Sequence, residues 1–104
     1  MKKAKIIIDE SIAISGHYRI ILNVLEVSVS KKFPFGIKAK FLLLDDMGNF
    51  PRLLVDNHEP FGFHMHTQLP RDSNIRIKLA VKDYNEALEL FYLEVERIVK
   101  NEDI

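Results

Sequence analysis

The sequence predicts an α+β fold, in which an antiparallel sheet of about six strands carries a single C-terminal amphipathic helix packed on one face. Two observations support this prediction. Residues 4–81 alternate short β-branched and apolar runs with turn residues, which is typical of strands. From Asp83 onward, apolar residues recur at steps of three and four, which is typical of a helix. The chain has 104 residues, enough for one core, and we predict a single domain over residues 1–104.

The strands are separated by recognisable breaks. A turn over residues 15–18 follows the first strand, and the β-branched content of the next run favours a long strand over a helix. Residues 31–36 interrupt that run, and the Asp-Met-Gly-Asn stretch at 46–49 is a hairpin signal. We expect strands over residues 4–9, 19–30, 37–45, 50–56, 63–67 and 75–81.

The final segment is predicted to be helical from about residue 83 to residue 100. Asp83, with Glu86 three residues later, resembles a capping box and marks the start of the helix. We interpret its apolar stripe as core packing. The stripe consists of Tyr84, Leu88, Phe91, Tyr92, Val95, Ile98 and Val99. Leu90 and Leu93 lie off the stripe, which indicates a second contact such as a partner protein.

The composition excludes several classes of protein. Hydrophobic residues make up 47% of the chain and charged residues 29%, the balance of a folded protein rather than a disordered one. Without cysteine there is no disulfide, thiolate nucleophile or Cys-ligated zinc. No apolar run is long enough for a membrane span, and Ile6–Ile8 is too short for a signal peptide, so we expect no membrane partner and a cytoplasmic location. The abundance of Lys, Glu and Ile suggests an archaeal or thermophilic source.

The net charge of zero hides an asymmetry. Residues 1–82 contain 13 lysines and arginines against 8 acids, whereas residues 83–104 contain 2 against 7. The net charges of the two parts are therefore +5 and −5. This pattern favours an anion on one side of the molecule and a cationic partner on the other.

Side-chain alternation predicts which residues share the face of the sheet opposite the helix. If every apolar row faces the helix, the opposite face collects two imidazoles, one carboxylate and five basic groups. These residues are His64, His66, Asp56, Lys38, Lys40, Arg52, Arg76 and Lys78. The five basic residues are the predicted nucleic-acid-binding residues, because lysine and arginine neutralise phosphates.

The second strand is apolar on both faces. Tyr18, Ile20 and Leu22 alternate with Ile21, Leu25 and Val27, so part of the face opposite the helix needs a cover. Since the chain offers only one helix, we predict that a second copy supplies that cover and that the protein is a homodimer.

Residues 55–66, V-D-N-H-E-P-F-G-F-H-M-H, contain three of the four histidines. Three interpretations are open. His64 and His66 could act as general acid and base, with Asp56 orienting one ring, in metal-free cleavage of RNA. The same three side chains could instead form an open three-ligand metal site.

In the third interpretation the histidines fix a loop by hydrogen bonds or lie at a dimer seam, Asp56 and Asn57 shape a turn, and Gly62 supplies a backbone conformation that other residues resist. We predict no cofactor and no metal.

The motif also suggests a family. Asp56, Asn57, Gly62, His64 and His66 follow the spacing D-N-x4-G-x-H-x-H. This spacing, together with the order of strands and the closing helix, resembles the TumE-type toxins of prokaryotic toxin–antitoxin modules. The resemblance covers most of the chain and implies a toxin component paired with an antitoxin protein and acting on nucleic acid or translation.

Two functional hypotheses follow. In the first, the chain is a TumE-like toxin that binds RNA and acts as a ribonuclease through His64, His66 and Asp56. In the second, it is a non-catalytic interaction or structural protein that works as a homo-oligomer. The first requires both imidazoles on the solvent side of the sheet, beside the lysine rows.

Overall fold

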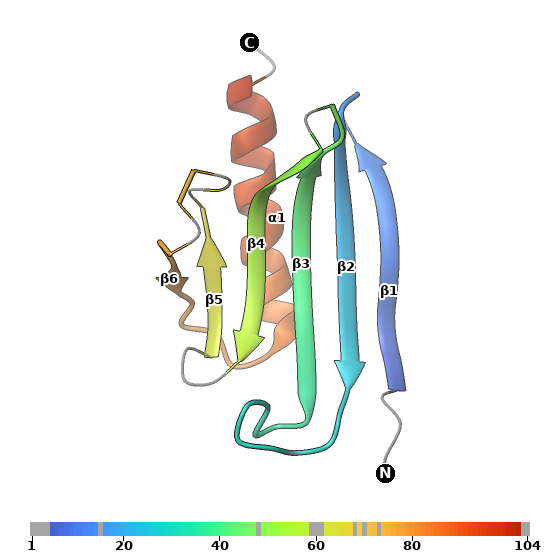
Figure 1. The fold of residues 1–104 in the computed structure, drawn as a ribbon, viewed down its shortest axis with the longest axis vertical. Helices are drawn as coiled ribbons and strands as arrows, with labels where there is room; N and C mark the ends of the chain where they lie inside the picture. The colour runs from blue at the N-terminus through green and yellow to red at the C-terminus, as the bar shows by residue number, and fades with distance from the viewer. Residues whose placement is uncertain are drawn as a thin grey trace.

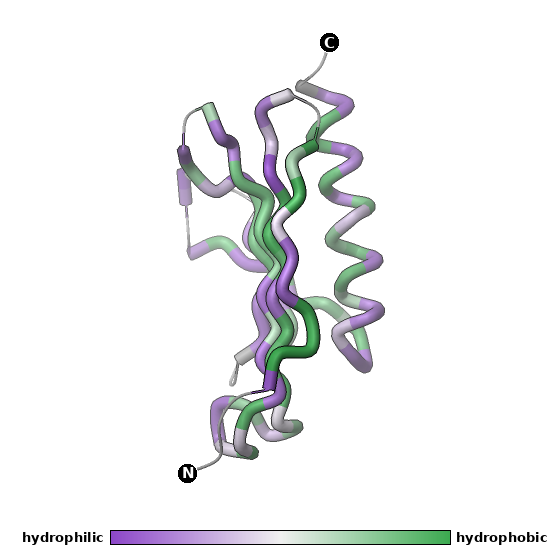
Figure 2. Tube along the Cα trace, turned by 90° about the vertical axis from the view of Figure 1, so that its right-hand side faces the viewer, coloured by the Kyte–Doolittle hydropathy of each residue, from purple (hydrophilic) through white to green (hydrophobic). Residues whose placement is uncertain are grey.

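The predicted α+β architecture is confirmed. The computed structural model describes residues 5–14, 16–47, 49–58, 62–67, 69, 71–72 and 74–102. It shows one open antiparallel sheet in the order β1-β2-β3-β4-β5-β6, with one helix on a single face (Figures 1 and 2). The elements are β1 (Lys5–Ile14), β2 (Tyr18–Glu26), β3 (Ile37–Asp45), β4 (Phe50–His58), β5 (Gly62–His66), β6 (Ile77–Lys78) and α1 (Tyr84–Glu102).

The core lies between the sheet and α1. The helix packs on β3 and β4, and the rings of Phe41 and Phe91 meet there with centroids 5.8 Å apart. Alternate residues of the strands point into this core, as their apolar spacing requires. The buried hydrophobic residues are Tyr18, Ile20, Leu22, Val24, Ala39, Phe41, Leu43, Leu53, Val55, Met65, Ala87, Phe91, Val95 and Ile98.

The two edge strands differ from the sequence prediction. β1 extends to Ile14 rather than ending at Asp9, because β2 offers a partner along its whole length and the Asn23 Nδ2 amide donates to Asp9 Oδ1 at 3.1 Å.

β6 contains only Ile77 and Lys78 rather than residues 75–81. Ile75 and Ile77, predicted to face the core, are 45% and 50% exposed. The short pairing with β5 leaves the rest of that run outside the sheet.

The second strand is shorter than predicted. β2 ends at Glu26 because the chain closes there into the connection of residues 27–36, where the Val27 amide donates to the Gly36 carbonyl at 2.8 Å.

The connection between β3 and β4 agrees with its hairpin signal. Asn49 adopts a positive φ of 53°, and the Met47 amide donates to Asp45 Oδ1 at 3.0 Å.

The helix begins after Asp83, as predicted. Asp83 Oδ1 accepts a hydrogen bond from the Glu86 amide at 3.0 Å, and Glu86 Oε1 accepts one from the Lys82 amide at 2.9 Å. The second bond reaches one residue further back than in the standard capping box. Tyr92, which we assigned to the core stripe, is 40% exposed. Ala87 is buried in the core instead.

No helix in the described parts of the chain is long and apolar enough to span a membrane.

Candidate functional site

A row of polar side chains crosses the sheet on the face opposite the helix. Directly paired residues of antiparallel strands share a face, so the register of the five strand pairs defines this row. From β1 to β6 it contains Asp9, Asn23, Lys40, Asp56, His64 and Lys78. Side-chain alternation therefore predicted correctly that Lys40, Asp56, His64 and Lys78 share one face.

The structure also brings the three predicted catalytic residues together. Asp56 is the direct cross-strand partner of His64, and the His64 and His66 rings meet edge to face with centroids 5.0 Å apart. Their exposure differs from the prediction. His64 is only 1% exposed and His66 only 9%. The expectation that both rings lie on the solvent side is therefore wrong, although the face is right.

The chain after β5 runs on the same side of the sheet as these two rings. The described part of the connection from β5 to β6 projects on the side of the sheet away from the helix (Figure 2). His64 and His66 point to that same side, because Met65 between them faces the core. The sequence did not reveal on which side this connection runs, because residues 69–74 carry turn signals that say nothing about the face on which the turn lies.

His64 is held by the backbone of its own strand. Its Nδ1 atom lies 2.8 Å from the Gly62 carbonyl oxygen. A carbonyl only accepts hydrogen bonds, so Nδ1 donates, and in the neutral ring the lone pair then lies on Nε2. The His64 Nε2 and His66 Nδ1 atoms are themselves buried. A general acid or base must come within hydrogen-bond reach of its substrate, and this burial keeps the Nε2 atom of His64 from that position.

Gly62 has the backbone role we predicted for it. It pairs with His58 to close the β4–β5 hairpin and has a positive φ of 61°. A Cβ built on Gly62 would meet no atom within 4 Å. The glycine is therefore explained by its backbone conformation and not by crowding.

Asn57 lies in a strand and not in the turn that we expected. Its Oδ1 atom accepts a hydrogen bond from the Ala39 amide at 2.7 Å, and its Nδ2 amide donates to the Ile37 carbonyl at 2.9 Å. The paired register of β3 and β4 ends at Lys40 and Asp56, so this side chain continues the contact between the strands where backbone pairing stops. Asp56 Oδ1 in turn accepts from the Asn57 amide at 2.8 Å.

The D-N-x4-G-x-H-x-H spacing thus has a structural explanation. Asn57 joins β4 to β3, Gly62 shapes the β4–β5 hairpin, and His64 binds the Gly62 carbonyl. This arrangement favours the third interpretation of the histidines, in which they support the local structure. Within the described residues, no group of three or more His, Cys, Asp or Glu side chains could hold a metal ion. His64, His66 and Asp56 accordingly do not form the three-ligand site that we considered.

The predicted nucleic-acid-binding residues separate into two groups. Lys38 and Lys40 are exposed and line a hollow of about 410 Å³ on the face opposite the helix. Ile6, Asp9, Asn23 and Leu25 complete its lining. Lys78 and Arg76 are exposed at the β6 edge, whereas Arg52 is half-buried where the β3–β4 register shifts. The structure therefore does not gather all five into one cluster.

The sequence prediction missed Asn23 and Asp9 as part of the hollow. Asn23 interrupts the apolar run of the second strand, and that interruption was the available signal. Recognising Asp9 requires the β1–β2 register, which places it directly beside Asn23.

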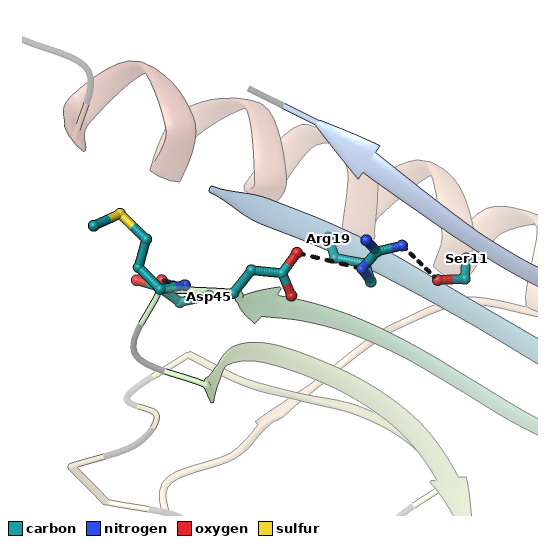
Figure 3. A network of polar contacts seen from close by, with 5 residues as sticks. Ser11, Arg19 and Asp45 are labelled. Atoms are coloured by element: carbon teal, nitrogen blue, oxygen red, sulfur yellow. Dashed lines mark hydrogen bonds and ion pairs between the residues drawn. The ribbon is translucent and has the colours of Figure 1, made fainter. Parts of the chain in front are cut away.

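Positive charge on this face is neutralised at the opposite end of β2. Arg19 Nε lies 3.3 Å from Asp46 Oδ2, and Arg19 Nη1 donates to Ser11 Oγ at 3.1 Å (Figure 3). Asp46 belongs to the β3–β4 turn. Arg19 is therefore not part of the basic surface around the hollow, which lies toward Lys38 and the β2–β3 connection.

Comparisons with protein-family models, with curated proteins and with solved structures found no match to this chain.

Proposed function

We propose that this chain is a TumE-like toxin component that binds RNA with the face of its sheet opposite the helix. The observation that supports this proposal is the hollow beside Lys38 and Lys40. The two lysines leave one strand face at positions two residues apart, about 7 Å along the strand, from which both side chains can contact one phosphate chain. Residues 27–44 contain four lysines and no acidic residue, so basic side chains continue from the hollow into the β2–β3 connection.

The proposal is for binding rather than cleavage. Acid–base chemistry would require His64 and His66 to reach the RNA, and both rings are buried. Phosphate binding by Lys38 and Lys40 needs no such access, because both side chains are exposed. The spacing of Asp56, Asn57, Gly62, His64 and His66 supports the relationship to TumE-type toxins, and an antitoxin protein is the partner that this relationship implies.

The experiment compares RNA affinity at two salt concentrations. Fluorescence anisotropy with a labelled single-stranded RNA should give a dissociation constant that rises with salt. On a plot of the logarithm of the association constant against the logarithm of the salt concentration, each neutralised phosphate contributes a slope of about −0.7. The double variant Lys38→Ala/Lys40→Ala should bind more weakly and lose about one to two units of that slope.

A matched double variant removes the same charge elsewhere. Lys82→Ala/Lys100→Ala changes two exposed lysines that lie beside Glu86 and Glu96 of the helix segment, away from the hollow. It should leave RNA affinity almost unchanged. Equal losses in both double variants would show non-specific charge attraction, and salt-independent or absent binding would refute the proposal. Shortened RNA in the parent sample would reopen the acid–base interpretation.

A second candidate function is a non-catalytic homo-oligomer. The observation that favours it is the exposed apolar edge of β1, where Ile6 is 62%, Ile7 39% and Ile12 40% exposed. An unpaired strand edge with apolar side chains is a surface on which another chain can add a strand. The oligomeric state in solution distinguishes this function from the first.

A further inference from the structure

The connection between β2 and β3 has an ordered shape. Besides the Val27–Gly36 bond at its neck, the Gly36 amide donates to the Phe33 carbonyl at 3.0 Å, and the Phe33 amide donates to Ser30 Oγ at 3.1 Å. The bond between Phe33 and Gly36 closes a β-turn with Pro34 and Phe35 at its two central positions. Proline suits the first of these positions because its φ is already fixed there.

This turn presents an aromatic side chain to solvent. Phe35 is 90% exposed, the highest value among the large hydrophobic residues that are described as exposed. Val29, in the same connection, is 74% exposed. A phenylalanine held outward by a hydrogen-bonded turn gives no packing energy to the fold, and together with Val29 it leaves apolar side chains of this connection available for binding.

Basic residues lie close to Phe35 in the sequence. Lys31 and Lys32 are exposed in the same connection, and the Lys32 ammonium lies 5.8 Å from the centre of the Phe33 ring. Lys38 follows Phe35 by only three residues, so at most about 10 Å of chain separates Phe35 from the β3 end of the hollow. The connection lies beyond the end of the helix (Figures 1 and 2), so the helix does not cover it.

We propose that the β2–β3 connection is a stacking platform, on which Phe35 stacks against an unpaired base while Lys31, Lys32, Lys38 and Lys40 hold the adjoining phosphates. This inference rests on the proposed RNA binding and adds the substrate class, which is single-stranded RNA. An aromatic ring beside a basic track is how proteins bind single strands, because every base has a face that can stack. A duplex keeps its bases paired and gives Phe35 nothing to contact.

The position of the lysines favours RNA over a membrane surface. A lipid bilayer would contact only the tip of the connection, near Phe35 and Val29. The lysines instead continue along β3 to Lys40 and into the hollow. This extended track fits a polyanionic chain that crosses the end of the sheet.

The test uses the full chain and labelled oligouridine, with an RNA duplex of equal length as the second probe. Phe35→Ala should weaken oligouridine binding by about 5- to 150-fold, the range expected for the loss of one stacked base. It should leave the salt slope unchanged, because no ammonium group is removed. The parent should bind the duplex no better than Phe35→Ala does.

Three further variants separate stacking from other causes. Met47→Ala removes another apolar side chain, 82% exposed at the β3–β4 turn, and should bind like the parent. Phe35→Leu keeps the apolar character but loses the ring, so it should bind as weakly as Phe35→Ala. Phe35→Trp should retain binding, and its indole, the only tryptophan in the chain, should be quenched by oligouridine.

The outcomes distinguish this inference from the proposed function. If Lys38→Ala/Lys40→Ala weakens binding and Phe35→Ala does not, RNA binding stands and the stacking platform is refuted. If the parent binds neither probe, both are refuted. A membrane contact would give a different pair of results. The parent and Phe35→Leu would both co-sediment with phosphatidylserine vesicles, and RNA would not quench the indole of Phe35→Trp. That outcome would overturn the inference.

Discussion

At the scale of single residues, the polar groups of the β4–β5 hairpin are tied to the backbone. Asn57 bonds two backbone groups of β3, and His64 bonds the Gly62 carbonyl. A buried polar group is costly unless it finds such a partner. The histidine and asparagine side chains therefore specify the local pairing of β3, β4 and β5.

Asn57 offers a direct test of this role. Asn57→Ala removes both hydrogen bonds to β3, and we expect the free energy of unfolding to fall by about 1–3 kcal/mol because the Ala39 amide and Ile37 carbonyl lose their partner. Urea unfolding measures the change. Asn85→Ala, at an exposed helix position, should change stability by less than about 0.5 kcal/mol. Equal effects of the two variants would contradict the bridging role.

Side-chain alternation predicted from the sequence which residues of the site share one face of the sheet. Alternation with a period of two placed His64, His66, Asp56 and Lys40 on one face, because Met65, Val55, Ala39 and Phe41 alternate with them and face the core. Alternation does not predict the burial of the imidazoles, because it gives the face of a side chain and not what lies over that face. The hydrogen bonds of Asn57 likewise depend on where backbone pairing between β3 and β4 ends.

At the scale of elements, predictability follows the strength of the local pattern. β3 was predicted with its observed bounds, because its apolar run is limited by a glycine on one side and two aspartates on the other. The helix agreed within two residues, since Asp83 marks its start. β1 and β6 were poorly predicted. Each lies at an edge, where its length depends on a neighbouring strand more than on its own sequence.

The connections between elements also make a prediction. Gly36 and Gly62 both have positive φ, at 70° and 61°, so an alanine at either position costs about 1–2 kcal/mol of backbone strain. Only Gly36 is also crowded, because a Cβ there would lie 3.0 Å from the Val27 carbonyl oxygen. Gly36→Ala should therefore destabilise the protein more than Gly62→Ala in thermal or urea unfolding. The reverse order would contradict this account of the β2–β3 connection.

At the scale of the whole molecule, the two sides of the sheet differ. The helix side is closed by α1, whose acids are partly compensated by local ion pairs. The Lys100 ammonium lies 3.2 Å from Glu96, and Glu94 pairs with Arg97, which raises the pKa of that guanidinium. The opposite side carries the lysine-lined hollow and half-buried apolar residues such as Ile21, Leu42 and Leu54. RNA and a second copy of the chain would therefore use the same side.

This competition gives the final prediction. If the open face and the β1 edge also form the predicted homodimer, light scattering should report a dimer at micromolar concentrations, and single-stranded RNA should shift it toward the monomer. Ile6→Lys places a charge at an exposed edge position beside the hollow and should also favour the monomer. Leu93→Lys, at a 63% exposed position on α1, should leave the dimer intact. A monomer in every sample would refute the homodimer, and dissociation only in Leu93→Lys would place the interface on the helix instead.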